Sequence, residues 1–221
     1  MQACNNPLRT VRAVTASLVC LMALTQAACT TSGGVSDRPV APRVQGQAAL
    51  SRAQVRDADA QFEQGLTALR ERRDDEARLI FQALSEAYPE LSGPLTNLGI
   101  LNAQGRDAAQ ALRDFTRAVE ANPRNAVAFN WLGVLHREQG AYGRAEAAYQ
   151  KAIALDAGYA PAYRNLGVLY DIYLQRPQAA IEQYRQYLTL TQSEDLIVLV
   201  WIKELEAQGI ATALPIAGAV P

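Results

Sequence analysis

Cysteine is confined to the start of this sequence. The chain has 221 residues and three cysteines, Cys4, Cys20 and Cys29, so residues 30–221 contain no thiol. A body without thiols excludes structural disulfides, cysteine nucleophiles and cysteine-ligated zinc from this part of the chain. Redox chemistry and zinc-finger function are therefore not expected.

Histidine and the motifs of common enzymes are scarce as well. His136 is the one histidine, and none of the motifs HExxH, GxSxG, GxxxxGKS and GxGxxG occurs. Acidic residues are scattered or fall at turns, as in the charged stretch 72–76. Because catalysis needs converging polar groups with displaced pKa values, the sequence predicts a non-enzyme with no catalytic residue, no cofactor and no bound metal. We expect His136 to pack between helices.

An excess of positive charge is also missing. The 21 Lys and Arg residues are balanced by 22 Asp and Glu residues, and the net charge is −1. Proteins that bind nucleic acid place clustered Lys and Arg side chains against the phosphates. The sequence therefore predicts no nucleic-acid partner, and no small-molecule substrate is expected either.

The stretch 1–28 has the pattern of a secretory signal peptide. Arg9 and Arg12 precede an apolar run, and no acidic residue occurs before Asp37. A positive start, an apolar middle and small residues at the cleavage point are the parts of such a signal. This run is clearly shorter than the roughly 20 residues that span a bilayer as a helix. A retained membrane anchor is the alternative interpretation.

The end of this apolar run resembles a bacterial lipoprotein signal. The run ends in Ala27-Ala28-Cys29, and in that family the cysteine is acylated and becomes the mature N-terminus. Gln26 stands three positions before the cysteine, where the family usually has leucine or a similar apolar residue. The resemblance implies lipidation of Cys29 and, because Thr30 follows it, a location on the periplasmic face of the outer membrane. Ordinary cleavage next to Ala27 or Ala28 would instead leave a soluble periplasmic protein.

Residues 29–47 are predicted to connect the lipidated cysteine to the rest of the chain. After Cys29 the stretch is rich in Gly, Ser, Pro and Thr and has no apolar periodicity. A flexible segment of this length has a root-mean-square reach of roughly 20 to 25 Å. We therefore expect a tether that holds the folded part near the membrane surface.

The rest of the chain repeats at a fixed interval. The four glycines Gly65, Gly99, Gly133 and Gly167 are evenly spaced. An alanine follows each of the first three glycines twelve positions later, and an aromatic residue follows that alanine after four more. The pairs are Ala77 and Phe81, Ala111 and Phe115, and Ala145 and Tyr149, with Ala180 and Tyr184 as the matching pair of the fourth copy. An interval of this length is typical of solenoids and propellers.

These features resemble the tetratricopeptide repeat, a helix–turn–helix unit of about 34 residues. Glycine and alanine let two antiparallel helices approach closely, and large apolar residues fill the space between them. The resemblance implies an all-α fold, a right-handed superhelical solenoid within a domain spanning residues 48–208. The four units are expected at about 58–91, 92–125, 126–159 and 160–194. One helical pair cannot bury its apolar face alone, so each pair packs against its neighbours.

The first and fourth repeats depart from the pattern. Gln61 and Gln64 occupy slots that are apolar in the other copies, which predicts a polar-faced cap at the start of the array. In the fourth repeat, Ala180 stands one position farther from Ala145 than the spacing of the glycines requires. We assign the inserted residue to the turn at residues 174–177, where it predicts a longer first helix or a bulged turn.

Residues 195–208 are predicted to form an amphipathic helix that closes the open end of the fourth repeat. The apolar residues expected on its packed side are Leu196, Ile197, Leu199, Val200, Ile202 and Leu205. Trp201 is expected to pack against the array rather than to bind a ligand. Residues 209–221 contain two prolines and no charge, and we predict a disordered tail there.

The first helices of the repeats are the candidate binding surface. In the family these helices line the concave side of the solenoid, and the resemblance implies that the exposed residues there contact a protein segment. The candidates are Phe62, Leu66, Ile100, Asn130, Val134, Arg137, Glu138, Arg164, Val168 and Asp171. Members that clamp the C-terminal carboxylate of chaperones use Lys and Asn on this face. The residues that directly follow the repeat glycines here are apolar, so no such clamp is expected. An apolar stripe beside Arg137 and Arg164 instead favours a segment with apolar anchors and some acidic residues.

The sequence therefore predicts a non-catalytic scaffold that binds other envelope proteins through its groove and the membrane through a lipid anchor. Lipoproteins that resemble this layout serve pilus or secretin assembly, and similar small repeat proteins accompany proton-driven energy-transduction systems. A regulator that docks peptidoglycan hydrolases or synthases is the alternative. An enzyme of the cell wall is disfavoured by the single histidine and the lack of paired acids.

Overall fold

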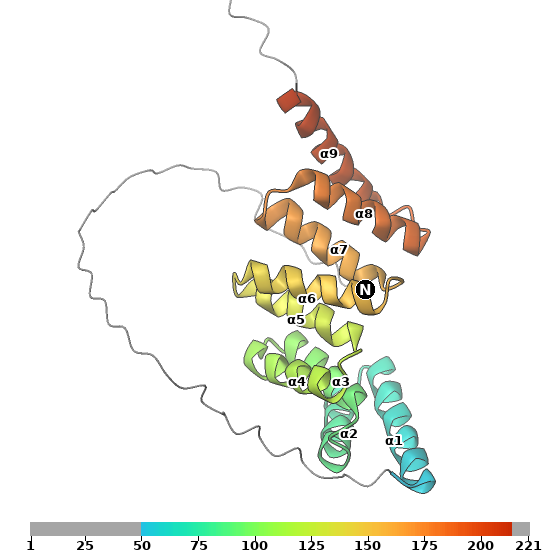
Figure 1. Cartoon of the computed structure of the whole chain (residues 1–221). Coiled ribbons are helices and arrows are strands. Elements are labelled where there is room, and N and C mark those ends of the chain that lie inside the picture. The colour runs from blue at the N-terminus through green and yellow to red at the C-terminus, as the bar shows by residue number, and fades with distance from the viewer. Residues whose placement is uncertain (1–49, 214–221) are drawn as a thin grey trace, which may run out of the picture. The chain divides into compact units, whose positions relative to one another are not determined.

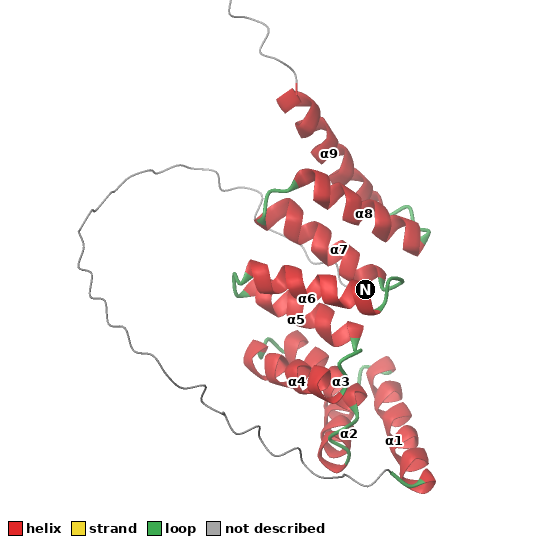
Figure 2. Ribbon diagram, viewed as in Figure 1, coloured by secondary structure: helices red, strands yellow, loops and turns green. Residues whose placement is uncertain are grey.

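The structure, a computed structural model, describes residues 50–213, with the side chains of residues 50–208. The expected signal peptide, the expected lipidation site Cys29 and the tether lie outside the described residues. So does the end of the expected tail, residues 214–221. Within residues 50–213 the regular elements are all helical, as Figure 2 shows.

The helices follow one another as antiparallel pairs. They are α1 (Arg52–Arg70), α2 (Asp74–Ala87), α3 (Ser92–Gln104), α4 (Ala108–Ala121), α5 (Ala126–Glu138), α6 (Tyr142–Leu155), α7 (Ala160–Val168), the π-helical turn η2 (Leu169–Tyr173), α8 (Pro177–Thr191) and α9 (Leu196–Ala213). Figure 1 shows the pairs α1–α2, α3–α4, α5–α6 and α7–α8 stacked in chain order, with α9 packed against α8. The expected solenoid of four helical pairs plus a closing helix is confirmed.

Each pair is held together by an aromatic ring that lies on a glycine. A Cβ atom placed on Gly133 of α5 would lie 2.5 Å from Cε1 of Tyr149 on α6. The same construction gives 2.6 Å between Gly65 and Phe81, 2.7 Å between Gly99 and Phe115, and 2.6 Å between Gly167 and Tyr184. No side chain, however small, fits at these distances, so the four glycines are required by close packing.

The alanines of the repeat are packed as tightly. Four of them, one on the second helix of each pair, have no exposed surface, and the same is true of the four aromatic residues; the alanines are Ala77, Ala111, Ala145 and Ala180. A methyl group there leaves room for the neighbouring helix, whereas a larger side chain would overpack the interface. The residues predicted to pack the repeats thus form the core.

The turn inside each pair contains a residue in the left-handed conformation. In the third repeat this residue is Gly140, with φ 74°, which glycine adopts without steric cost. In the second repeat Gly105 caps the C-terminus of α3 with φ −75°, and the left-handed residue is Arg106 at φ 63°. Arg72 and Gln175 hold the matching positions of the first and fourth repeats.

Side chains cap the N-termini of several helices. The Asp107 carboxylate accepts a hydrogen bond from the Gln110 backbone N–H at 2.9 Å, and Asn125 caps α5 in the same way. At the start of α1, Ser51 and Gln54 form a capping box, which satisfies two backbone donors that the first turn leaves open. This cap starts α1 at Arg52, well before the expected start of the repeat at Ala58.

The inserted residue of the fourth repeat lies in a π-helical turn. Helix α7 continues directly into η2, and together they are one residue longer than α5, the first helix of the third repeat. The Leu174 N–H donates to the Leu169 carbonyl at 3.0 Å, an i to i+5 bond that absorbs one extra residue without ending the helix. The predicted longer first helix is confirmed, with the insertion slightly earlier than residues 174–177.

The closing helix α9 is apolar on two sides, which corrects the expected pattern. Val198, Ile202 and Leu205 are buried against the fourth repeat. Leu196 and Val200, expected on the packed side, are 71 % and 51 % exposed, and Ile197 is 54 % exposed. At about 100° per residue, positions 196 and 200 fall opposite positions 198, 202 and 205, so one face of this apolar sequence must point outward.

The helix α9 also continues to Ala213, so residues 209–213 of the expected tail are helical. Pro215 follows shortly in the sequence, and a proline disfavours helical backbone in the residue before it. In the described part of the chain, no helix combines the length and the apolar character needed to cross a membrane.

Two glycine substitutions test the packing account. Gly133→Ala is expected to lower the free energy of unfolding by about 1–3 kcal/mol, because the new methyl group overlaps a buried ring. Gly143→Ala is the matched control on α6, where nothing lies within 4 Å of the added carbon; it is expected to raise stability by up to about 1 kcal/mol. Urea unfolding followed by circular dichroism measures both. Equal effects of the two substitutions would contradict the account.

Candidate functional site

The first helices of the repeats lie on the inner side of the stack. Helix α3 contacts α5, and α5 contacts α7, whereas successive second helices approach one another less. The closer row of helices is the inside of the curve, so the surface of α1, α3, α5 and α7 that faces away from the second helices is the concave face. The structure thus places the candidate binding residues on the helices that line this face.

Most of the candidate residues are partly accessible there. Glu138 is exposed, and the half-buried candidates are Phe62, Leu66, Ile100, Val134, Arg137, Arg164, Val168 and Asp171. Asn130 differs, because it is only 4 % exposed. A groove that binds a protein segment needs side chains with free surface, and all the candidates except Asn130 keep some.

Asn130 is a structural residue rather than a surface contact, which corrects its expected place. Its amide oxygen accepts a hydrogen bond from Asn165 Nδ2 at 2.9 Å, a contact that joins α5 to α7. Its amide also forms a hydrogen bond with the hydroxyl of Tyr159. Buried polar groups need such partners. These contacts hold the Asn130 side chain between two repeats, where a partner in the groove cannot reach it.

The first half of the concave face is apolar. Phe62 packs against Phe81 with ring centroids 5.6 Å apart, and Leu66 and Ile100 continue the apolar surface. A hollow of about 440 Å³ lies beside Phe62 and is lined by α1, the start of α3, the end of α4 and the loop between α2 and α3, which contributes Leu91. A hollow of this volume is large enough for one apolar side chain of a partner.

The second half of the concave face carries two arginines, each held over an aromatic ring. The Arg137 guanidinium carbon lies 5.9 Å from the ring centroid of Tyr173, and that of Arg164 lies 5.6 Å from the ring centroid of Trp201. Each arginine thus extends from its own helix onto an aromatic ring of a later element, η2 for Arg137 and α9 for Arg164. Attraction between a cation and the ring face holds the long side chains in place.

A buried hydroxyl lies beside Arg137. Tyr149 is fully buried, and its hydroxyl has no hydrogen-bond partner. Burial raises the pKa of Tyr149 to about 12, while the positive charge of Arg137 lowers it. In the fourth repeat the equivalent hydroxyl, on Tyr184, donates to Asp171 Oδ2 at 3.3 Å. The two tyrosines therefore place hydroxyl groups beneath the groove in the third and fourth repeats.

His136 lies at the C-terminal end of α5, in the slot that holds Tyr170 one repeat later. It is half-buried between helices, as expected for a packing residue. Burial lowers its pKa from the ordinary value of 6.5, and the charge of Arg144 lowers it further, while a hydrogen bond with Gln139 raises it. Among the described residues no group of His, Cys, Asp and Glu is arranged to hold a metal ion.

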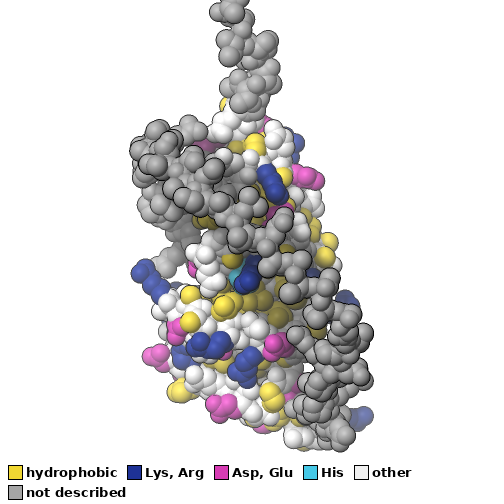
Figure 3. Space-filling model, turned by 60° about the vertical axis from the view of Figure 1, so that its left-hand side comes forward, with side chains coloured by type: hydrophobic (Ala, Val, Ile, Leu, Met, Phe, Trp, Pro, Cys, Tyr) yellow, Lys and Arg dark blue, Asp and Glu magenta, His cyan; other side chains and the backbone are white. Residues whose placement is uncertain are grey.

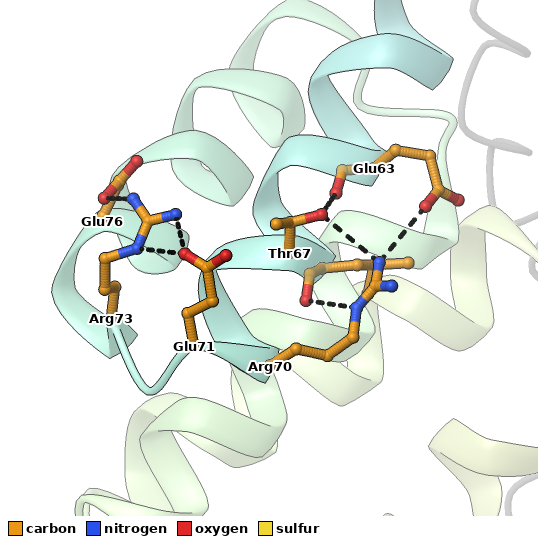
Figure 4. A network of polar contacts seen from close by, with 7 residues as sticks. Glu63, Thr67, Arg70, Glu71, Arg73 and Glu76 are labelled. Atoms are coloured by element: carbon orange, nitrogen blue, oxygen red, sulfur yellow. Dashed lines mark hydrogen bonds and ion pairs between the residues drawn. The ribbon is translucent and has the colours of Figure 1, made fainter.

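A separate polar network at the turn between α1 and α2 is a surface feature. Figure 4 shows Arg73 between Glu71 and Glu76, and Arg70 beside Glu63 and Thr67. The arginine and glutamate side chains of these ion pairs are about half exposed or more, and pairs of this kind contribute little to stability. On the face seen in Figure 3, basic, acidic and hydrophobic side chains are interspersed, without a field of one charge.

Sequence reasoning found the arginines but not the residues that hold them. Trp201 was expected only to pack, and it does lie on Tyr184, while Tyr173 lies on Tyr142. Both rings also hold an arginine of an earlier helix, because successive repeats stack on one another. The sequence signal for this second role is the presence of an aromatic residue in the element that follows each arginine-bearing helix in the stack.

These observations define a class of protein, a helical-repeat solenoid that presents a preformed groove to other proteins. A family model for the tetratricopeptide repeat matches residues 46–92 and 96–160, slightly more than half of the chain. The chain belongs to the tetratricopeptide repeat family. Members of this family bind peptides or protein partners and are generally non-catalytic.

Solved structures agree with this assignment. A structure of Pseudomonas aeruginosa pilF is 20 % identical with a TM-score of 0.64, and the likeness covers 72 % of each chain. YrrB, described as a TPR protein with an unusual peptide-binding site, is 23 % identical with a TM-score of 0.54 over 66 % of this chain and 74 % of its own. At these identities the likeness concerns the fold alone.

A sequence relative is the probable UDP-N-acetylglucosamine–peptide N-acetylglucosaminyltransferase SPINDLY of Arabidopsis thaliana. It is 40 % identical over 55 residues, which are 25 % of this chain and 6 % of the relative. Because the match spans so little of that protein, its transferase activity is not carried over to this chain.

The lowered pKa of His136 predicts a pH dependence of stability. Because its folded pKa lies below 6.5, the stabilisation is complete above pH 6.5 and is lost as the pH falls through the folded pKa. The free energy of unfolding, measured in urea at pH 7.5 and 5.5, should therefore fall more in the wild type than in His136→Tyr. Equal losses in the two proteins would show that this histidine is not responsible.

Proposed function

We propose that the chain is a non-catalytic adaptor at the periplasmic face of the outer membrane, anchored through acyl chains on Cys29. In this role the concave face holds a segment of another envelope protein, and residues 29–47 tether the solenoid to the membrane. The complex it serves is of the kind that assembles pili or secretins, or that transduces energy from proton flow.

The observation that carries the adaptor role is the two-part concave face. An apolar half with a hollow beside Phe62 is followed by a polar half in which Arg137 and Arg164 lie on aromatic rings. Apolar anchors supply most of the affinity in peptide grooves, and a few placed polar groups supply register. The described residues offer this arrangement and no cluster suited to holding a metal.

The anchor is supported by the sequence around Cys29. An apolar run preceded by two arginines ends at this cysteine, and a polar stretch follows. Acyl chains contribute about 0.8 kcal/mol per buried methylene group, so several chains on one residue bind a membrane firmly where a single chain would not. The solenoid itself then needs no membrane-binding surface.

Replacing the acylated cysteine tests the proposal. Cys29→Ser is expected to move the protein from the membrane fraction to the soluble fraction and to abolish incorporation of a labelled fatty acid. Cys20→Ser is the matched control and should leave both unchanged. Fractionation of cell envelopes and fatty-acid labelling measure the outcome, and membrane association of the Cys29→Ser protein would refute the lipid anchor.

A further inference from the structure

The polarity of the concave face changes between the second and third repeats, and the core aromatic residue changes with it. Twelve positions before Phe81 and Phe115 stand Leu69 and Ala103. Twelve positions before Tyr149 stands Arg137. The core aromatic residue therefore has a hydroxyl group in the repeat whose first helix has a charged residue twelve positions before it.

Arg137 and Tyr149 together present donors without acceptors. A guanidinium has five N–H donors and a neutral phenol has one O–H donor. Arg137 Nε and the Tyr149 hydroxyl are both buried and have no hydrogen-bond partner. Because burial keeps the pKa of Tyr149 at about 12, the hydroxyl remains a donor at neutral pH. Buried donors of this kind are costly unless an acceptor is supplied.

Arg164 repeats the arrangement beside α9. Its Nε is also buried without a partner, and its guanidinium lies on Trp201. Stacking on a ring leaves the planar edge of the guanidinium open for in-plane hydrogen bonds, the geometry that matches a carboxylate. Neither Arg137 nor Arg164 forms an ion pair with a carboxylate of the described residues.

Glu138, the acidic residue next to Arg137, does not supply this acceptor. Glu138 follows Arg137 at the exposed end of α5, and its charge raises the pKa of Tyr149. It nevertheless forms no ion pair with Arg137, because adjacent residues on a helix point in directions about 100° apart. An acceptor from a partner would have to reach the exposed parts of the two guanidinium groups from the open side of the groove.

We propose that the half-buried Arg137 and Arg164 form carboxylate-binding subsites that receive acidic groups of the captured segment. This inference rests on the proposed function, since it names the chemistry of the partner held in the groove. The apolar half of the groove takes the anchors of the segment, and the two subsites fix its direction, with its acidic part over the third and fourth repeats. Two separate arginines in a protein of net charge −1 suit a protein segment rather than a polyanion such as nucleic acid.

Selection of displayed peptides on the purified full-length protein tests this inference. Random dodecapeptides displayed on phage are selected, and one enriched peptide is synthesised in four forms: unchanged, with its acidic residues replaced by the matching amides, with a C-terminal amide, and with both changes. Dissociation constants are measured for the wild type, Arg137→Gln, Arg137→Lys, Arg164→Gln and the control Arg113→Gln. Arg113 is exposed on α4. Circular dichroism confirms that each variant is folded.

The expected result is a shared dependence on the acid and the arginine. Replacing the acidic residues should weaken binding to the wild type about tenfold to a hundredfold, as expected for loss of a charged hydrogen bond. Arg137→Gln should cause a similar loss, and replacing the acidic residues should weaken binding to this variant less than it weakens binding to the wild type. Arg137→Lys keeps the charge but loses the planar edge, so its affinity should lie between those of the wild type and Arg137→Gln. Arg113→Gln should bind as the wild type does. If the C-terminal amide alone weakens binding, the carboxylate received is that of the chain end.

Two other results would contradict the inference, and they differ in what they imply for the proposed function. Enriched peptides without acidic groups, or equal acid dependence in the wild type and both glutamine variants, would overturn the carboxylate subsites and leave the adaptor role standing. Failure of any peptide to enrich on the wild-type protein would count against capture of a segment by the groove, and the proposed function would fail together with this inference.

Discussion

The contact between a glycine of the first helix and an aromatic ring of the second is the interaction on which the rest of the structure depends. In each repeat the ring occupies the space where a side chain would begin, so that a Cβ atom on the glycine would overlap ring carbons. This contact sets the separation of the two helices, and the buried alanines on the second helices keep it small. Because each pair also packs on the next, one contact repeated four times determines the spacing of the first helices and hence of the groove.

The same rings connect the core to the binding face. In the third repeat, the ring that lies on Gly133 carries the Tyr149 hydroxyl to a point beside Arg137. The arginines are then held over aromatic rings of later elements, so that little rotamer freedom is left to lose when a partner binds. The groove is thus preorganised by the contacts that build the array, and enlarging a glycine would disturb both.

The sequence predicted the repeats, their core and the helices that line the concave face, because small and large residues recur at a fixed period. It did not predict which residue of the second turn is left-handed, because glycine adopts this conformation without steric cost and yet Arg106, not the neighbouring Gly105, adopts it. Asn130 was placed on the surface because its slot faces the groove in the family, yet its amide joins α5 to α7. Leu196 and Val200 were predicted on the packed side of α9 but lie on its exposed side. Both sides of this helix are apolar, so the periodicity of the sequence does not distinguish them.

Photo-cross-linking from the groove tests most directly the claim that the concave face holds a partner segment. A diazirine side chain is introduced either at Val134, half-buried on α5, or at Lys151, exposed on α6. Intact cells are illuminated, and cross-linked products are separated by mass. The account predicts a discrete product from position 134 that is absent from position 151. A product from position 151 and none from position 134 would contradict it.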